Sequence, residues 1–169
     1  MAILRKLQPS ARAIILDSAK EKILLVKRKD LPVWELPGGG IEEGETPEES
    51  VLREVFEETG LKANITRPVG IYYPLCRLAS VSYTFECTPY EGDMRLSDET
   101  TDIRFFPLNK LPKYLPPPYP HWINDALENN SDCLVKPISS VTYKALLAYL
   151  IKYPKLVTIF LLSRMKKSY

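Results

Sequence analysis

Histidine and cysteine are scarce in this chain, which has one histidine and three cysteines among its 169 residues. The single histidine, His121, excludes every metal site built from several histidines, and a catalytic triad would depend on this one residue. Cys76, Cys87 and Cys133 lie far apart and never form a Cys-x-x-Cys pair. The sequence therefore indicates neither a disulfide scaffold nor a zinc ribbon, and we expect three reduced thiols in a cytoplasmic protein.

Long apolar runs are missing as well. The first ten residues, MAILRKLQPS, lack the apolar stretch of a secretory signal peptide, so nothing in them argues for export. Near the C-terminus the longest stretch without a charge or a proline is residues 156–163, which is eight residues long. A helix that spans a bilayer needs ~20 residues, so we expect no such helix.

Acidic residues are absent from the C-terminal part of the chain. All 21 of them lie at or before Asp132, together with 16 bases, so residues 1–132 carry a net charge of −5. The seven bases that follow have no acidic neighbour and carry +7, although the whole chain carries only +2. We expect no specific nucleic-acid partner, because the acidic part would repel a phosphate backbone.

The remaining composition fits one folded domain, with 45% apolar and 26% charged residues. Runs rich in β-branched residues, or alternating between apolar and polar residues, predict strands. These runs are residues 11–17, 22–28, 65–73, 81–87 and 101–106. The run at 65–73 is the weakest of them because Pro68 and Gly70 interrupt it.

The clearest helix signal begins at Thr46, which is a good N-cap. Pro47 suits the first helical position and Glu49 completes a capping box, while Gly60 is expected to end the helix. Its apolar stripe must pack on a sheet and consists of Val51, Leu52, Val55 and Phe56. Strands on both sides of such a helix predict a layered domain of the α/β or α+β class.

Three glycines, Gly38, Gly39 and Gly40, precede this helix and predict a loop whose backbone can approach a ligand closely. They are not a Walker A loop, because no Lys-Ser or Lys-Thr follows them. They are not a dinucleotide fingerprint either, because Glu43 stands where the third glycine would fall.

Three carboxylates leave the same side of the helix, since Glu54, Glu57 and Glu58 occupy positions i, i+3 and i+4. Like charges at these spacings destabilise a helix by roughly 0.2–0.5 kcal/mol per pair, so something should compensate for the repulsion. One interpretation is a solvated face on which Arg53 softens the repulsion. The other is a divalent cation, because carboxylate oxygens without histidine or thiolate suit Mg²⁺ or Mn²⁺.

The same segment resembles a known family. Gly39, five residues, Glu45, seven residues and the run REVFEETGL at 53–61 resemble a complete Nudix box with every defined position filled. The chain is therefore similar to the Nudix hydrolase superfamily of MutT-like proteins. The resemblance implies an α/β/α sandwich with a mixed β-sheet, and hydrolysis of a nucleoside diphosphate linked to another group X.

The resemblance also implies roles for individual residues. Glu54, Glu57 and Glu58 become ligands of Mg²⁺ or Mn²⁺, and the Gly39 carbonyl becomes a further one. Arg53 would hold these carboxylates by salt bridges, with Glu45 behind it. A carboxylate must take the proton of the attacking water, and two assignments stay open. One is Glu54 and the other is Glu99, an acid on a later loop.

Substrate specificity is less legible. We expect the glycine loop at residues 38–40 and the Arg28 cation to meet substrate, with Trp34 and Tyr73 stacking on a planar group. Pro or Tyr residues that mark the ADP-ribose and diadenosine polyphosphate subgroups are missing from the matching window, residues 76–79. Because neither subgroup is indicated, we expect a nucleoside triphosphate or a nucleotide sugar as the substrate. The alternative function is a non-catalytic Nudix-fold module that binds a nucleotide or a partner.

We place the Nudix domain at residues 1–134 and a basic, apolar-rich helical extension at residues 135–169. The extension reads as two helical segments hinged at Pro154, and its apolar residues make full exposure unexpected. Two interpretations remain. The extension docks on protein, either its own domain or a second subunit of a homodimer, or it makes peripheral contact with an anionic membrane. We favour protein docking.

Overall fold

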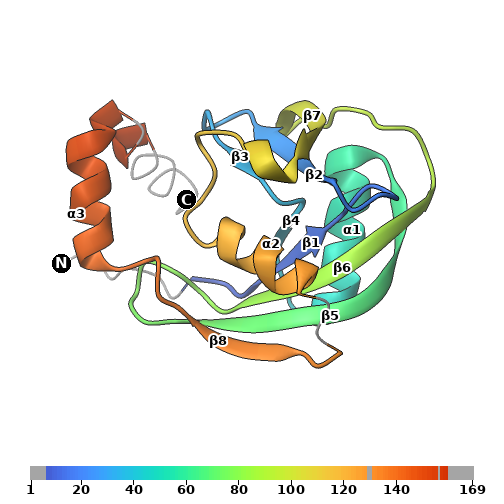
Figure 1. Ribbon diagram of the computed structural model, residues 1–169, viewed down its shortest axis with the longest axis horizontal. Coiled ribbons are helices and arrows are strands. Elements are labelled where there is room, and N and C mark those ends of the chain that lie inside the picture. Colours follow the sequence, from blue (N-terminus) through green and yellow to red (C-terminus); the bar gives the residue numbers. More distant parts are fainter. Residues whose placement is uncertain (1–6, 129–130, 156, 160–169) are drawn as a thin grey trace.

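A computed structural model describes residues 7–128, 131–155 and 157–159. Within these residues the chain forms two sheets with helices on their faces (Figure 1). The larger sheet has the order β4-β1-β6-β5-β8. Its strands are β4 (Gly38–Gly40), β1 (Ser10–Ile14), β6 (Ser82–Glu91), β5 (Lys62–Pro74) and β8 (Leu134–Ile138). The smaller sheet has the order β3-β2-β7 and consists of β3 (Trp34–Glu35), β2 (Lys22–Arg28) and β7 (Thr100–Pro107).

The larger sheet is mixed. Strand β1 runs parallel to β6, and β5 runs parallel to β8. The pairs β1–β4 and β5–β6 are antiparallel, as are both pairs of the smaller sheet. This arrangement confirms the predicted mixed sheet.

Helix α1 (Pro47–Thr59) covers one face of the sheets. Its buried residues Val51 and Val55 belong to a core cluster that also contains Ala13 and Leu24 from the strands and Phe85 from β6. Burying such aliphatic side chains contributes about 1.5–3 kcal/mol each, so the apolar stripe of α1 fixes the helix against the sheet.

Helix α2 (Tyr119–Leu127) covers the other face. Its Trp122 and Ile123 pack with Tyr72 in a second core cluster, to which Ile23 and Leu25 of β2 contribute. The neighbouring residue Leu24 points into the α1 layer, so β2 is buried on both sides. Two helical layers around the sheets form the predicted α/β/α sandwich.

Two elements differ from the sequence-based expectation. The helical extension was expected to begin at residue 135, but residues 135–138 together with Leu134 form β8 at the edge of the larger sheet, beside β5. Strand β5 runs continuously through Pro68 and Gly70 because shifts in its register with β6 absorb both residues. The extension itself contains α3 (Tyr143–Lys152), and residues 154–155 and 157–159 are also helical.

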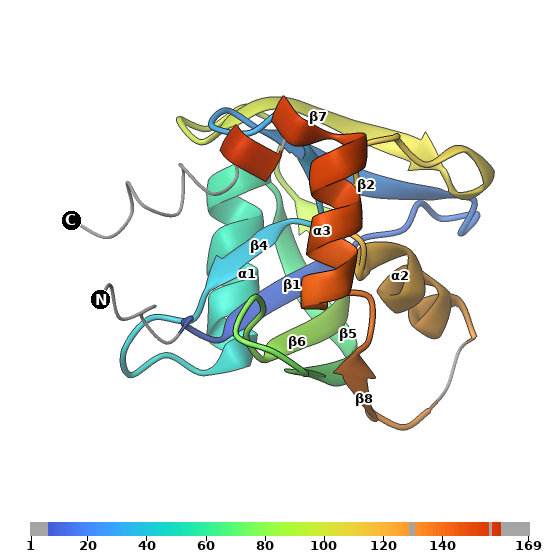
Figure 2. The same ribbon diagram turned by 90° about the vertical axis from the view of Figure 1, so that its left-hand side faces the viewer.

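Helix α3 lies at one end of the molecule, and it is in front when that end is viewed directly (Figure 2). It contains no buried residue, but Leu146 is half-buried and Val157, which follows the helix, is buried, so the extension is not fully exposed. Within the described ranges, no helix combines the length and the apolar character needed to cross a membrane. The rest of the predicted second segment, residues 160–167, lies outside the described residues.

Candidate active site

Local signals fix both ends of α1. Thr46 Oγ1 accepts a hydrogen bond from the Glu49 amide at 3.2 Å, and Glu49 Oε2 accepts one from the Thr46 amide at 2.8 Å. Gly60 ends the helix in the left-handed conformation with φ +77°, and its amide donates to the Phe56 carbonyl. The capping box predicted from the sequence is therefore present, and it sets the position of every carboxylate on the helix.

The glycine loop packs directly against β1 and α1. Gly38 adopts φ +139° with its Cα facing the Ala11 carbonyl, so a side chain has neither an allowed conformation nor space there. At Gly39 an added Cβ would overlap the carboxylate of Glu54. The absence of side chains is what lets strand β4 approach the acidic face of the helix.

Loop and helix together border a cleft with a volume of about 510 Å³. The lining residues come from the N-terminal segment, β1, the end of β2, β4, α1 and the loop before β7. They are Gln8, Arg12, Arg28, Gly38, Gly39, Gly40, Glu42, Arg53, Glu54, Glu57, Glu58, Ser97, Asp98 and Glu99. The structure thus brings the glycine loop, the three helical glutamates and Glu99 together, although up to 61 residues separate them in the sequence.

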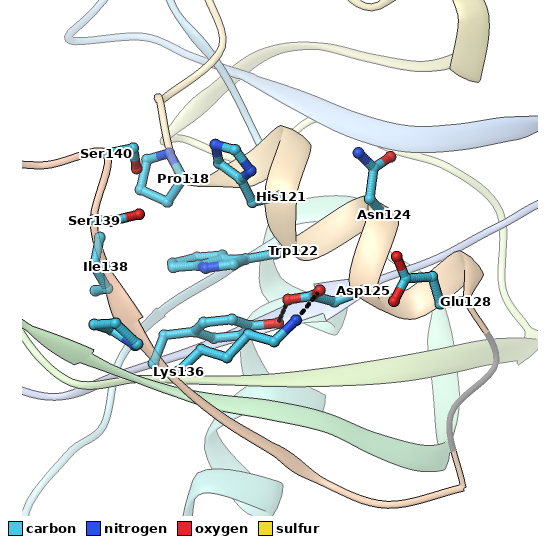
Figure 3. A pocket seen from close by; sticks show the side chains of 12 residues that line it. Pro118, His121, Trp122, Asn124, Asp125, Glu128, Lys136, Ile138, Ser139 and Ser140 are labelled. Carbon is cyan, nitrogen blue, oxygen red and sulfur yellow. Dashed lines mark hydrogen bonds and ion pairs between the residues drawn. The ribbon is translucent and has the colours of Figure 1, made fainter.

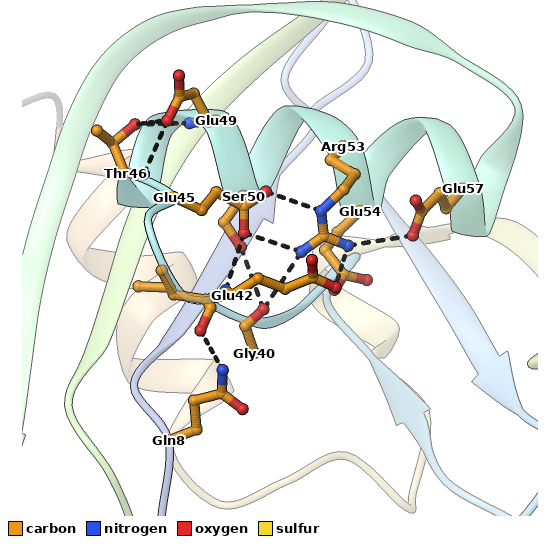
Figure 4. Close-up of polar contacts among 11 residues, drawn as sticks. Gln8, Gly40, Glu42, Glu45, Thr46, Glu49, Ser50, Arg53, Glu54 and Glu57 are labelled. Carbon is orange, nitrogen blue, oxygen red and sulfur yellow. Dashed lines mark hydrogen bonds and ion pairs between the residues drawn. The ribbon is translucent and has the colours of Figure 1, made fainter.

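Arg53 of α1 makes polar contacts with several residues of the helix and of the preceding loop (Figure 4). Its guanidinium donates to both carboxylate oxygens of Glu45, at 2.8 and 3.0 Å. It also donates to Glu54 at 3.0 Å and to Glu57 at 3.1 Å, and it reaches the Gly40 carbonyl at 3.3 Å. One cation therefore neutralises carboxylates that would otherwise repel each other, and it ties the helix to the glycine loop.

The carboxylates of the site have opposite electrostatic surroundings. The hydrogen bonds from Arg53 lower the pKa of Glu45 to about 2, which keeps this carboxylate ionised. Burial raises the pKa of Glu54, and it raises the pKa of Glu58 to about 8. The charge of Arg12 and the Gly38 amide, which donates to Glu58 at 2.8 Å, oppose the effect of burial without cancelling it.

The chemistry of these donors fits a hard divalent cation. Every donor is a carboxylate or carbonyl oxygen, as Mg²⁺ and Mn²⁺ prefer, and the buried Glu58 carboxylate needs positive charge beside it to stay ionised. In the part of the chain that the structure describes, no three histidine, cysteine or carboxylate groups already converge into a metal cluster. Arg53 instead holds Glu54 and Glu57, so a cation would have to draw these two side chains away from it.

Two predicted substrate-binding residues are not among those that line the cleft. The Trp34 ring packs edge-on against Phe106, with a centroid distance of 4.6 Å, at the margin of the α2 core. Tyr73 is exposed on β5, which lies on the far side of β6 from the glycine strand β4. The sequence showed two aromatic residues near the box but not which sheet each would occupy.

Arg12 is a cleft residue that sequence reasoning missed. It is largely buried on β1, donates a hydrogen bond to the Gly38 carbonyl and lies 3.5 Å from Glu35 Oε2. Glu35 is also 3.5 Å from Arg28, whose guanidinium makes a bidentate pair with Asp30. A charged residue inside the apolar run ARAIIL was the available signal, because a strand buries an arginine only with a partner.

A second, smaller pocket of about 260 Å³ lies between α2 and β8 (Figure 3). The Tyr72 hydroxyl donates to Asp125 at 2.7 Å, and Lys136 donates to the other Asp125 oxygen at 2.6 Å. His121 also lines this pocket rather than the cleft. The polar groups at its base bind one another, which is the arrangement of a structural contact between α2 and the sheet.

Comparison with known proteins agrees with this architecture. A family model described as the NUDIX domain matches residues 6–126. A putative 8-oxo-dGTP diphosphatase of Bacillus subtilis is 35% identical over 115 residues, which cover 66% of this chain and 75% of that protein. An ADP-ribose pyrophosphatase of Methanocaldococcus jannaschii is 39% identical over 110 residues, which cover 60% of this chain and 65% of that protein.

A solved structure of a UDP-X diphosphatase superimposes with a TM-score of 0.65 at 27% identity, covering 76% of this chain and 66% of that one. The family match spans strands β1 to β7, the glycine loop, α1 and the loop that carries Glu99. The chain therefore belongs to the NUDIX family, and its enzyme class is that of a Nudix pyrophosphohydrolase.

Proposed function

We propose that the cleft hydrolyses a phosphoanhydride bond of a nucleoside diphosphate linked to another group, with Mg²⁺ or Mn²⁺ as cofactor. The observation that carries this proposal is that the glycine loop, the three helical glutamates and three arginines line one cleft. A polyphosphate needs both cations and close backbone approach, and the cleft offers both kinds of group.

Glu54, Glu57, Glu58 and the Gly39 carbonyl are the groups that would hold the divalent cation. When bound, the cation would neutralise phosphate charge and lower the pKa of the attacking water. Arg53 donates hydrogen bonds to Glu54 and Glu57, which line the cleft, and it is also paired with Glu45. Its role is positional, because its hydrogen bonds go to the protein.

Arg28 and Arg12 also line the cleft and supply positive charge to it. Both lie near Glu35, and Arg28 is also held by Asp30, so their guanidinium groups are ordered before substrate arrives. We assign Arg28 to the substrate phosphates, since it is the more exposed of the two. Fixing such a charge in advance reduces the cost of ordering it during binding.

The general base is Glu54 or Glu99. Glu54 is partly buried beside Gly39, and burial raises the pKa of its carboxyl group, which favours proton uptake. Glu99 is exposed on the loop before β7 and reaches the cleft from the other side.

The names of the relatives indicate a common part of the substrate but not the group attached to it. Their names include an 8-oxo-dGTP diphosphatase, an ADP-ribose pyrophosphatase and a UDP-X diphosphatase, which share a nucleoside diphosphate and differ in the attached group. We propose a nucleoside triphosphate or a nucleotide sugar as the substrate of this chain. Trp34 and Tyr73 are not part of this proposal, because they do not line the cleft.

Product analysis tests the hydrolytic proposal. The full chain is incubated with nucleoside triphosphates, nucleotide sugars, ADP-ribose and dinucleoside polyphosphates, each with Mg²⁺ or Mn²⁺. We expect the double variant Glu57→Gln, Glu58→Gln to turn over the best substrate at least ~100-fold more slowly, the scale of losing a metal or general-base contribution.

Glu48→Gln is the matched control, because Glu48 is an exposed carboxylate on the same helix that does not line the cleft. It should retain the activity of the unmodified chain. If the double variant were as active as this control, the cleft would not be catalytic, and a nucleotide-binding module would be the better description.

A pH profile distinguishes the two bases. Glu99→Gln is compared with Asp98→Asn, the adjacent acid of the same loop, and with Glu54→Gln. The variant that lacks the base should lose the acidic limb of the kcat/KM profile, whereas a variant that only weakens binding should keep the limb and raise KM.

A further inference from the structure

Helix α3 exposes most of its apolar side chains, although it is the most apolar part of the described chain outside the core. Leu147 is 60% exposed and Ile151 is 79% exposed, and Tyr143 and Leu150 are exposed as well. They occupy positions i, i+4, i+7 and i+8 from Tyr143, so they form one stripe along the helix. Soluble monomers rarely expose a contiguous apolar patch of this kind without a function for it.

The body of the protein holds α3 from the opposite side. Tyr153, which follows the helix, packs edge-on against Tyr114 with a centroid distance of 5.9 Å, and Lys113 lies over the Tyr153 ring. Leu146 and Ala145 are half-buried on the inner side. The stripe is therefore on the exposed side of α3, which lies at the front of the molecule in Figure 2.

The lysines of this region have no acidic partner. Lys144, Lys152 and Lys155 are exposed, and none of the ion pairs among the described residues includes them. No acidic residue follows Asp132 anywhere in the sequence. The helix that carries the apolar stripe thus also carries positive charge, and none of the ion pairs among the described residues neutralises it.

We propose that α3 is a peripheral membrane-docking helix that lies on an anionic phospholipid bilayer, with its apolar stripe at the level of the acyl chains and its lysines at the headgroups. A bilayer surface matches both features, since it presents negative charge above apolar matter over an area wider than the helix. Tyr143, which belongs to the stripe, suits this boundary because its ring has an apolar body and a polar tip.

A second copy of the chain matches less well. A symmetric contact would place one α3 against another, and both are basic and free of acids. Docking of α3 on the acidic body of another copy would need a complementary apolar patch. The exposed large apolar residues of the described body are instead spread over both helices, four strands and three connecting segments: Phe56, Tyr73, Leu75, Tyr90, Met94, Leu96, Phe105, Tyr114, Leu127 and Val135. A lipid surface is therefore the better match for α3 than a second copy of the chain.

Vesicle sedimentation tests the proposal with the full chain. Large vesicles of phosphatidylcholine alone are compared with vesicles in which about a third of the lipid is phosphatidylserine. We expect binding to the anionic vesicles, little binding to the neutral ones, and release when the salt concentration is raised, because screening weakens the lysine contribution.

Substitutions separate the two contributions. The double variant Leu147→Ser, Ile151→Ser should weaken binding to anionic vesicles at least about tenfold, and Lys144→Gln, Lys152→Gln should weaken it by a similar factor. Val135→Ser removes an exposed apolar residue of β8, outside α3, and should bind like the unmodified chain. Circular dichroism and the hydrolytic activity of each variant should stay unchanged, because none of these residues lines the cleft.

The proposal is overturned if the chain ignores phosphatidylserine, or if Val135→Ser weakens binding as much as the α3 variants do. It is also overturned if light scattering shows a dimer that the α3 substitutions dissociate while vesicle binding is absent, since a second copy then covers the stripe. Preferential binding of the helix to RNA, with no binding to vesicles, overturns it as well. None of these outcomes affects the hydrolytic proposal.

Discussion

Helices α1 and α3 begin with the same kind of N-terminal cap, but they differ in how far they are buried. Each starts at a threonine whose hydroxyl accepts a hydrogen bond from the amide three residues on, from Glu49 to Thr46 and from Ala145 to Thr142. Helix α1 buries Val51 and Val55 against the sheets, whereas α3 buries none of its residues. A cap decides where a helix begins, and packing decides how strongly the rest of the protein depends on it.

The largest difference between the two helices should appear in their apolar residues. Val55→Ala should lower the free energy of unfolding by about 2 kcal/mol, because it removes two buried methyl groups and leaves a cavity under α1. Leu147→Ala on α3 should change it by less than about 0.5 kcal/mol, since this side chain already contacts water. Urea denaturation measures both values. Equal losses would show that α3 is packed as tightly as α1.

The caps should show a smaller difference of the same kind. Thr46→Ala should cost about 1 kcal/mol of global stability, because α1 is part of the cooperative core. Thr142→Ala removes an equivalent hydrogen bond, but we expect it to speed amide exchange within α3 while leaving global unfolding almost unchanged. Hydrogen exchange read residue by residue distinguishes local from global loss. A shared loss of global stability would contradict the separation of the two helices.

Two cysteines differ in burial in the same way as the two helices, so their thiol groups test the same difference. Cys87 lies in the core layer under α1, where burial raises the pKa of its thiol to about 12, and Cys133 is exposed just before β8. At pH 8 a thiol reagent should modify Cys133 quickly and leave Cys87 unmodified until the protein unfolds. Rapid modification of both in the native protein would show that the α1 layer opens easily.

The raised pKa of Cys87 also makes the free energy of unfolding depend on pH. The native state holds the thiol proton more tightly than the unfolded chain, whose thiol has its ordinary pKa of 9.0. The free energy of unfolding should therefore fall as the pH rises from about 9 toward 12, and Cys87→Ala should remove its share of that slope. Buried Tyr72 and Tyr119 have raised pKa values too, so part of the slope should remain in the variant.

Much of the active-site helix was predictable because its signals are local. Thr46, Pro47, Glu49 and Gly60 each act within one turn of the chain, so their effect does not depend on distant residues. The α/β/α layers were predictable in outline, since the apolar stripe of α1 had to pack on a sheet. The run that forms β2 was buried on both faces, and its lack of alternation indicated this.

The surroundings of the carboxylates depended on contacts between distant parts of the chain. Glu58 is partly buried where its carboxylate accepts from the Gly38 amide of β4, and the charge that acts on it most strongly, Arg12, is 46 residues away in the sequence. Residues 134–138 form β8 because an edge of the sheet at β5 was free to pair with them. Neither fact has a local pattern, since each depends on which strands become neighbours.

The sequence alone determined the box of glycines, glutamates and arginine, the place where its helix starts and stops, and the separation of charge between the two parts of the chain. Only the tertiary structure decided which aromatic residues stay away from the cleft, which arginines border it, and that α3 keeps its apolar stripe exposed. The physical reason is range. Backbone caps and charge counts act over a few residues, whereas burial, pKa and exposure are set by whatever the fold places alongside.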